Sequence, residues 1–120
     1  MSDEKLVESA EQLRQKKCLP CEGGVDPLTA AEAEKLMGSL NRWELSADGK
    51  SVSRARNCEN FLGAIEAIKG IAEVAESEQH HPDLHLTGYR HLQIVLTTHA
   101  IGGLSENDFI VAAKIDQLLD

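Results

Sequence analysis

The chain has 120 residues, of which 42% are hydrophobic, and its 12 basic and 20 acidic side chains give a formal net charge of −8. This length and composition are those of one globular domain, and with only 3% aromatic residues its core must be built from Leu, Ile, Val and Ala. The negative charge repels a phosphate backbone, and no basic stripe carries interleaved aromatic residues, which argues against direct binding to nucleic acid.

Nothing in the sequence predicts a membrane or secretory segment. No apolar run approaches the roughly 20 residues that cross a bilayer, and the first residues, MSDEK, are acidic rather than basic and then apolar. Three cysteines, an odd number, do not make a disulfide framework, which favours a reducing compartment. We expect a soluble cytoplasmic protein, and a nuclear location stays open.

The beginning of the chain is predicted to be a short helix followed by a connector. In residues 3–15, one helical face carries Leu6, Ala10 and Leu13, a spacing typical of an amphipathic helix. Residues 18–27 contain prolines and glycines, which interrupt periodic structure. The first core element is therefore expected after this connector.

The connector contains Cys18 and Cys21 at a spacing found in metal and redox sites. A structural zinc ion needs four ligands, but only Cys58 remains as a further thiol. A redox pair of the thioredoxin kind needs a helix after the motif, where this sequence has Glu-Gly-Gly. We interpret the two cysteines as exposed loop thiols.

A helix is predicted at about residues 29–40. Thr29 and Glu32 have the spacing of a capping box, in which each side chain accepts a hydrogen bond from the other residue's backbone N–H. The apolar residues behind it have helical spacing: Ala33, Leu36, Met37 and Leu40.

A β-hairpin is predicted next, with strands over residues 43–47 and 50–56. The strands flank Asp48-Gly49, a dipeptide that tolerates the positive φ angles of a tight turn. Trp43 is expected to pack in the core, because the chain has so few aromatic residues.

The longest helix is predicted from Asn57, as its N-cap, to about Glu76. Its apolar residues form a broad face that we expect to line the core. They are Phe61, Leu62, Ile65, Ile68, Ile71, Ala72 and Val74.

A second hairpin is predicted over residues 84–87 and 90–98, around Gly88-Tyr89. Its second strand alternates apolar and more polar residues, so one face should be buried and the other partly polar. The apolar set is Leu92, Ile94 and Leu96, with Thr98 at the end. Tyr89 is expected to pack on neighbours or to form a pocket wall.

The last helix begins with a second capping box, Ser105 and Asp108, and keeps an apolar stripe to the end of the chain. The order helix, hairpin, helix, hairpin, helix favours an α+β fold, an antiparallel four-stranded sheet with helices packed on one face. We expect an N-terminal helical extension, residues 1–27, and one domain, residues 28–120.

All five histidines fall between residues 80 and 99. His80 and His81 follow the long helix, and His99 ends the last strand, and such element ends can present side chains to a ligand. Imidazole titrates near neutral pH, so these three residues could supply an acid, a base and a binding group in one pocket. Glu76, one turn before His80, would orient that ring if its carboxylate reaches it.

A zinc site is the chemical alternative, because histidines and a carboxylate form catalytic zinc sites. Adjacent histidines rarely both bind one ion, and no H-E-x-x-H spacing is present. We therefore expect no metal ion. His85 and His91 lie among polar strand neighbours and are expected to face solvent or another subunit.

Together these residues resemble a known family, the pterin-4a-carbinolamine dehydratases. The matching pattern is Glu76-x3-His80-His81-Pro82, then Tyr89, His99 and Asp108, with Trp43 in the first hairpin and Gly-Leu-Ser-Glu after Thr98-His99. The resemblance extends from about Leu28 to the C-terminus. The chain departs from the family pattern in its N-terminal extension and in having six residues between Pro82 and Tyr89.

The resemblance implies a dehydratase that uses no cofactor. A 4a-hydroxytetrahydropterin would lose its bridgehead hydroxyl as water and a proton from a ring nitrogen, giving the quinonoid dihydropterin, in tetrahydropterin recycling. The implied catalytic residues are His80, His81 and His99, with Glu76 and Asp108 as supporting carboxylates; which histidine is the acid stays open. By its capping box, Asp108 is expected to be mainly structural. The implied substrate contacts are His80, His81, Pro82, Thr98 and His99.

The resemblance also implies partners. Family members form homodimers and homotetramers, and in animals one serves as a dimerisation cofactor for a transcription factor. Possible partners are therefore a pterin-dependent hydroxylase or a transcription factor. A protein-interaction module with little or no dehydratase activity is the alternative function, although a pure scaffold has no physical reason to keep the three histidines.

Overall fold

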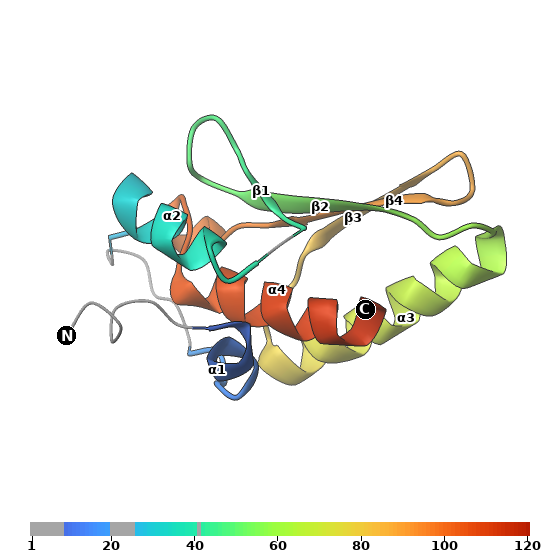
Figure 1. The fold of residues 1–120 in the computed structure, drawn as a ribbon, viewed down its shortest axis with the longest axis horizontal. Helices are drawn as coiled ribbons and strands as arrows, with labels where there is room; N and C mark the ends of the chain where they lie inside the picture. Colours follow the sequence, from blue (N-terminus) through green and yellow to red (C-terminus); the bar gives the residue numbers. More distant parts are fainter. Residues whose placement is uncertain (1–8, 20–25, 41) are drawn as a thin grey trace.

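The structure is a computed structural model that describes residues 9–19, 26–40 and 42–120. Its elements are α1 (Ala10–Arg14), α2 (Ala30–Met37), β1 (Glu44–Leu45), β2 (Val52–Asn57), α3 (Phe61–Glu78), β3 (Asp83–Thr87), β4 (His91–Leu96), the 3-10 turn η2 (His99–Ile101) and α4 (Glu106–Leu119). Figure 1 shows the helices on one face of an open antiparallel sheet whose strand order is β1-β2-β4-β3. The predicted α+β class and four-stranded sheet are confirmed.

Both predicted hairpins are present, and they join through β2 and β4 in the middle of the sheet. The turn of the second hairpin has positive φ angles at Gly88 (55°) and Tyr89 (58°), the combination of a tight two-residue turn. In β4, Leu92 and Ile94 are buried, whereas His91 is exposed. The predicted alternation therefore sets which face of the sheet the helices cover.

Helix α4 is the centre of the core and packs against both α1 and α3 (Figure 1). The predicted capping box of Ser105 and Asp108 is confirmed. Most of the first half of the helix is buried, from Asn107 through Ala113, and so is Ile115. A helix buried on several faces is expected where it lies between a sheet and other helices.

Helix α3 differs from its prediction in three respects. Its N-cap is Asn60, which accepts a hydrogen bond from the Gly63 N–H, rather than Asn57. The helix also runs past Glu76 to Glu78. The predicted apolar face is only partly buried: Ile71 is fully buried with Ala64 and Ala75, but Phe61, Leu62 and Ile65 are exposed.

The described part of the N-terminal extension packs on the core. Helix α1 begins after Ser9, which has an extended conformation and forms a capping box. The prediction of one continuous helix over residues 3–15 is therefore wrong at Ser9, and residues 1–8 lie outside the described part. Leu13 is completely buried in the core cluster. The division of the chain at residue 27 stays a prediction. Helix α2 has the predicted capping box of Thr29 and ends at Met37.

A buried ion pair lies at the C-terminal end of α4. Arg54, from β2, is 3% exposed and its guanidinium hydrogen-bonds to Asp116 and, at 2.8 Å, to Asp120. The indole of Trp43, buried as predicted, donates to Asp116 at 2.8 Å. The hydrogen bond from Arg54 holds the pKa of Asp120 below its usual range. This cluster ties the sheet to the end of the helix.

Candidate functional site

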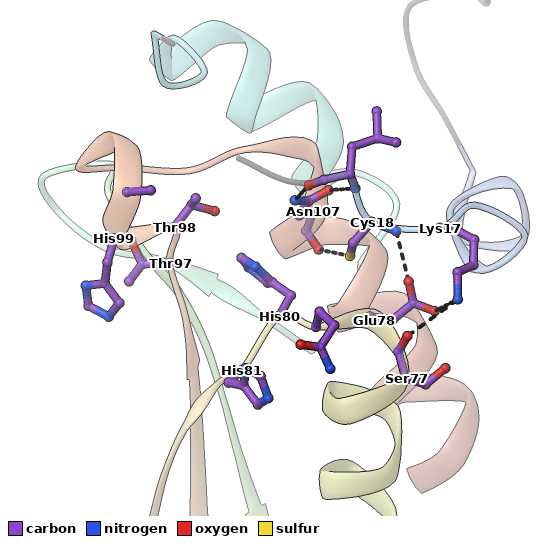
Figure 2. Close-up of a pocket in the computed structure, with 13 residues that line it drawn as sticks. Lys17, Cys18, Ser77, Glu78, His80, His81, Thr97, Thr98, His99 and Asn107 are labelled. Carbon is purple, nitrogen blue, oxygen red and sulfur yellow. Dashed lines mark hydrogen bonds and ion pairs between the residues drawn. The ribbon is translucent and has the colours of Figure 1, made fainter. Parts of the chain in front are cut away.

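A pocket of about 640 Å³ opens where the ends of several elements meet. Its lining comes from four places: residues 17–19, residues 77–81 at the end of α3, residues 97–100 after β4, and Asn107 in the first turn of α4. The volume lies within the roughly 300–1,000 Å³ of typical small-molecule sites. Figure 2 shows His80, His81 and His99 around this opening.

The end of α3 sets the position of His80. Gln79 has a left-handed conformation (φ 54°), and the His80 N–H donates to the Ala75 carbonyl at 3.2 Å. This is the hydrogen bond of a Schellman motif, which reverses the chain directly after a helix. His80 therefore turns back across the end of the helix toward α4.

The ring of His80 is paired with a fully buried carboxylate. Its Nε2 lies 2.6 Å from Asp108 Oδ1, and the side chains are 12% and 0% exposed. The other oxygen, Oδ2, accepts hydrogen bonds from the Thr98 hydroxyl at 2.8 Å and from the Ser105 N–H at 3.0 Å. Asp108 thus both completes the capping box of α4 and fixes the imidazole of His80. The interpretation of Asp108 as mainly structural accounts for only one of its two oxygens.

Glu76 pairs with His81 and not with His80. Glu76 Oε2 and His81 Nε2 are 2.6 Å apart, with side chains 72% and 54% exposed. The expectation that Glu76 would orient His80 is therefore wrong. The cause is the reversal at Gln79, which carries His80 to α4 and leaves its neighbour beside the last turns of α3.

His99 belongs to a short closed loop after β4. Backbone hydrogen bonds between Thr98 and Gly103 close the loop, and Gly102 has the positive φ (70°) that the turn requires. Among the described residues, the His99 ring has no hydrogen-bond partner, and it is exposed at the pocket. Figure 2 places it across the opening from Ser77 and Glu78.

Other residues of the sequence pattern, among them Pro82 and Tyr89, lie outside this pocket. Pro82 lines a separate apolar crevice of about 150 Å³ between α3 and β3, which Glu76 and His81 also border. Tyr89 is 57% exposed in the hairpin turn, with Arg90 over its ring at 5.6 Å, so the expectation of a pocket wall is wrong. His85 and His91 are exposed, as predicted.

The site predicted from the sequence did not include the beginning of the chain. Residues 17–19 line the pocket, and Glu78 and Asn107 hold them there. One signal was available for Glu78, because it follows Ile71 and Ala75 at helical spacing on the buried face of α3. A charge on an apolar face indicates a specific partner.

Glu78 and Cys18 have shifted pKa values that report this contact. Burial alone would raise the pKa of Glu78, but hydrogen bonds from Lys114 and the Cys18 N–H hold it below its usual range. Burial, and then the charge of Glu78, raises the pKa of the Cys18 thiol to about 12. For Cys18 the prediction of an exposed thiol is therefore wrong, since it is half-buried. Cys21 lies outside the described residues.

The described residues contain no group of three His, Cys, Asp or Glu side chains that could hold a metal ion. In the same ranges, no helix has the length and apolar character of a transmembrane span. At His80 and His81, one ring nitrogen is already engaged by a carboxylate.

The known proteins that resemble this chain have consistent names. A protein from Methylococcus capsulatus named putative pterin-4-alpha-carbinolamine dehydratase is 45% identical over 88% of this chain and 92% of its own length. The Arabidopsis thaliana protein named pterin-4-alpha-carbinolamine dehydratase 2, mitochondrial, is 41% identical over 92% of this chain and 60% of its own length. A crystal structure of a transcriptional coactivator/pterin dehydratase from Brucella melitensis shares the fold, with a TM-score of 0.73 at 24% identity over 79% of this chain and all of that one.

The family model described as pterin 4 alpha carbinolamine dehydratase matches residues 26–118, a range that begins before α2 and ends one residue before the end of α4. This range also contains the pocket's three histidines and both of their carboxylate partners. By this match and by its identity to the named relatives, the chain belongs to the pterin-4a-carbinolamine dehydratase family.

Proposed function

We propose that this protein dehydrates a 4a-hydroxytetrahydropterin to the quinonoid dihydropterin and water, in tetrahydropterin recycling, by acid–base catalysis from His80, His81 and His99. The observation that carries the proposal is the 2.6 Å pair of His80 and the buried Asp108 at the wall of the pocket. The names of the relatives support the reaction. The three histidines supply imidazoles, the side chains most often used for proton transfer in catalysis.

The geometry suggests how the proton transfers are divided. In the reaction the C–O bond to the bridgehead hydroxyl breaks, the oxygen leaves as water after receiving a proton, and a ring nitrogen loses one. With Nε2–H of His80 donating to Asp108, Nδ1, which has no hydrogen-bond partner among the described residues, can accept the nitrogen's proton, and the carboxylate then stabilises the imidazolium. His81 and His99 are exposed and can exchange protons with water, which suits the donor to the leaving oxygen.

We propose that no metal ion or resident cofactor takes part. The reaction needs only one proton donor and one acceptor, which the three histidines provide. Thr98 lines the pocket but its hydroxyl is engaged by Asp108, so its contact with substrate would be made through the backbone or the methyl group. Activity is expected to be insensitive to a chelator such as EDTA.

The experiment is the loss of synthetic 4a-hydroxytetrahydropterin followed by ultraviolet absorbance, with and without EDTA. His80→Ala should lower kcat by about 10² to 10⁴, and His81→Ala and His99→Ala should each lower it as well. His91→Ala is the matched control, because His91 is exposed on the other face of the sheet. No acceleration by the folded wild type would reject the proposed reaction.

A second candidate function is protein interaction, as a homodimer or homotetramer or with another protein such as a pterin-dependent hydroxylase or a transcription factor. The exposed apolar residues Phe61, Leu62 and Ile65 in the first turns of α3 support it, since monomeric proteins rarely leave such clusters uncovered. Sedimentation of the wild type and of Leu62→Glu tests the homo-oligomer: the variant should sediment as a smaller species. A monomeric wild type would contradict it.

We also propose a cytoplasmic location. The odd cysteine count supports it, whereas the plant relative's name places that longer protein in the mitochondrion. Fractionation of cells that express the full chain with a C-terminal tag checks this, and recovery in an organelle fraction would contradict it.

A further inference from the structure

We infer that residues 17–19 form a substrate-binding wall of the pocket, and that Glu78 and Asn107 are the positioning residues that hold this wall in place. The inference rests on the proposed function of the same pocket. Lys17, Cys18 and Leu19 line the cavity that the three histidines share. In Figure 2, Lys17 and Cys18 lie on the opposite side of His80 from His99.

Asn107 holds the segment through its side-chain amide. Its Oδ1 accepts a hydrogen bond from the Leu19 N–H at 3.0 Å, and its Nδ2 donates to the Leu19 carbonyl at 2.5 Å. The Cys18 thiol donates to the backbone carbonyl of Asn107, 3.7 Å away. Asn107 is 7% exposed and immediately precedes Asp108. The amide therefore holds both backbone groups of one residue, as a neighbouring strand would.

Glu78 holds the preceding residue. Its Oε1 accepts a hydrogen bond from the Cys18 N–H at 2.9 Å, and its Oε2 pairs with Lys114 of α4. Glu78 is 7% exposed and lies two positions before His80. A buried carboxylate loses stabilisation when any of its partners is removed. The hydrogen bond between Glu78 and the Cys18 N–H is therefore a partly buried contact and not a surface one.

Each positioning residue lies close in sequence to one member of the His80–Asp108 pair. Glu78 is two residues from His80, and Asn107 is next to Asp108. The wall is thus fixed to the same two elements that fix the His80–Asp108 pair. A ligand that reaches His80 from the pocket must enter between this wall and the residues after β4. Loss of the wall should weaken binding and leave the proton-transfer groups in place.

The test combines kinetics with labelling of Cys18 by iodoacetamide in a Cys21→Ser background, read by mass spectrometry. Saturating 7,8-dihydrobiopterin should slow the labelling of Cys18 by about fivefold or more, because binding and accessibility of the wall are reciprocally linked. Cys58 is the internal reference, since it lies between β2 and α3 and lines none of the described pockets. Its labelling rate should not respond to the pterin.

The variants are Asn107→Leu and the near-isosteric Asn107→Asp, which keeps an acceptor for the Leu19 N–H and loses the donor to its carbonyl. Both should raise KM by about fivefold or more and hold kcat within about twofold, and both should speed the labelling of Cys18. Thr29→Ala is the matched control: it removes a helix cap that lies outside the pocket lining and should leave KM, kcat and labelling unchanged.

Three outcomes separate this inference from the proposed reaction. If the wild type is active but the pterin does not change the labelling rate of Cys18, the inference about the wall is wrong and the proposed reaction stands. A fall in kcat at constant KM in both Asn107 variants also rejects it, because the residue would then act through Asp108. An inactive wild type in which the pterin still protects Cys18 rejects the reaction and supports the wall.

Discussion

The two ends of helix α4 both hold carboxylates that face buried partners, but the partners differ in kind. At the C-terminal end, Asp116 and Asp120 meet the guanidinium of Arg54, which hydrogen-bonds to both carboxylates. At the N-terminal end, Asp108 meets the imidazole of His80, the kind of side chain most often used for proton transfer in catalysis. None of the residues of the first arrangement lines the histidine pocket, whereas His80 of the second lines it and Asp108 is buried behind it. The same helix thus carries a structural pair and a pair suited to proton transfer.

The strongest test of this contrast removes one carboxylate charge at each end of α4 in turn. Asp108→Asn should lower kcat by about 10² or more, because the amide cannot stabilise an imidazolium as a carboxylate does. Asp116→Asn should leave kcat within about twofold of wild type. Dehydration rates at a temperature where both variants are folded provide the measurement. Equal losses at the two ends would show that the contrast is wrong.

Stability should show the opposite ranking. Arg54→Met leaves Asp116 without its buried cation and should lower the free energy of unfolding by about 3–5 kcal/mol. His80→Ala leaves Asp108 with its hydrogen bonds from the Thr98 hydroxyl and the Ser105 N–H and should cost less. Urea unfolding at pH 7 compares the two variants. A greater loss for His80→Ala would reverse the assignment of the structural end.

The middle of α4 offers an intermediate case, the pair of Lys114 and Glu78. The pKa of Glu78 is below its usual value of 4.5, so its stabilisation is present above that value and is lost as the pH falls through the folded-state pKa. Glu78→Gln should lower the free energy of unfolding by about 1–3 kcal/mol at pH 7. The wild-type and variant curves should converge as the pH falls from 4.5 through the folded-state pKa of Glu78. Curves that stay parallel throughout the acid range would contradict the lowered pKa.

The smallest effect is expected at the exposed pair. His81 and Glu76 are both more than half exposed, and exposed ion pairs contribute about 0–1 kcal/mol. Glu76→Gln should therefore lower kcat by no more than about fivefold, far less than Asp108→Asn. The same absorbance assay measures both. A loss as large as that of Asp108→Asn would mean that exposure does not separate the two histidine–carboxylate pairs.

Much of the fold could be predicted from local patterns. The second hairpin turn, the alternation in β4 and the capping box of Ser105 and Asp108 depend on residues close together in the sequence, and all are confirmed. The start of α3 was missed because Asn57 and Asn60 are both good caps and only the path of the chain after β2 selects between them. The sequence also predicted the meeting of His80, His81 and His99.

The pairing of those histidines could not be predicted in the same way. Which ring reaches Glu76 depends on the left-handed conformation of Gln79, and a glutamine carries no signal for it. The bond from His80 to Asp108 spans 28 positions and depends on how α4 packs. The anchoring of residues 17–19 likewise joins groups 60 and 88 positions apart.

The long span of the His80–Asp108 bond gives the pocket a direct dependence on global folding. The histidine comes from the end of α3 and its carboxylate from the first turn of α4, with the whole second hairpin between them. No fragment that lacks either helix can assemble the pair, and neither can a compact intermediate whose helices have not docked. Recovery of catalysis during refolding should consequently coincide with the last tertiary step, and heat inactivation should follow the cooperative unfolding transition instead of preceding it.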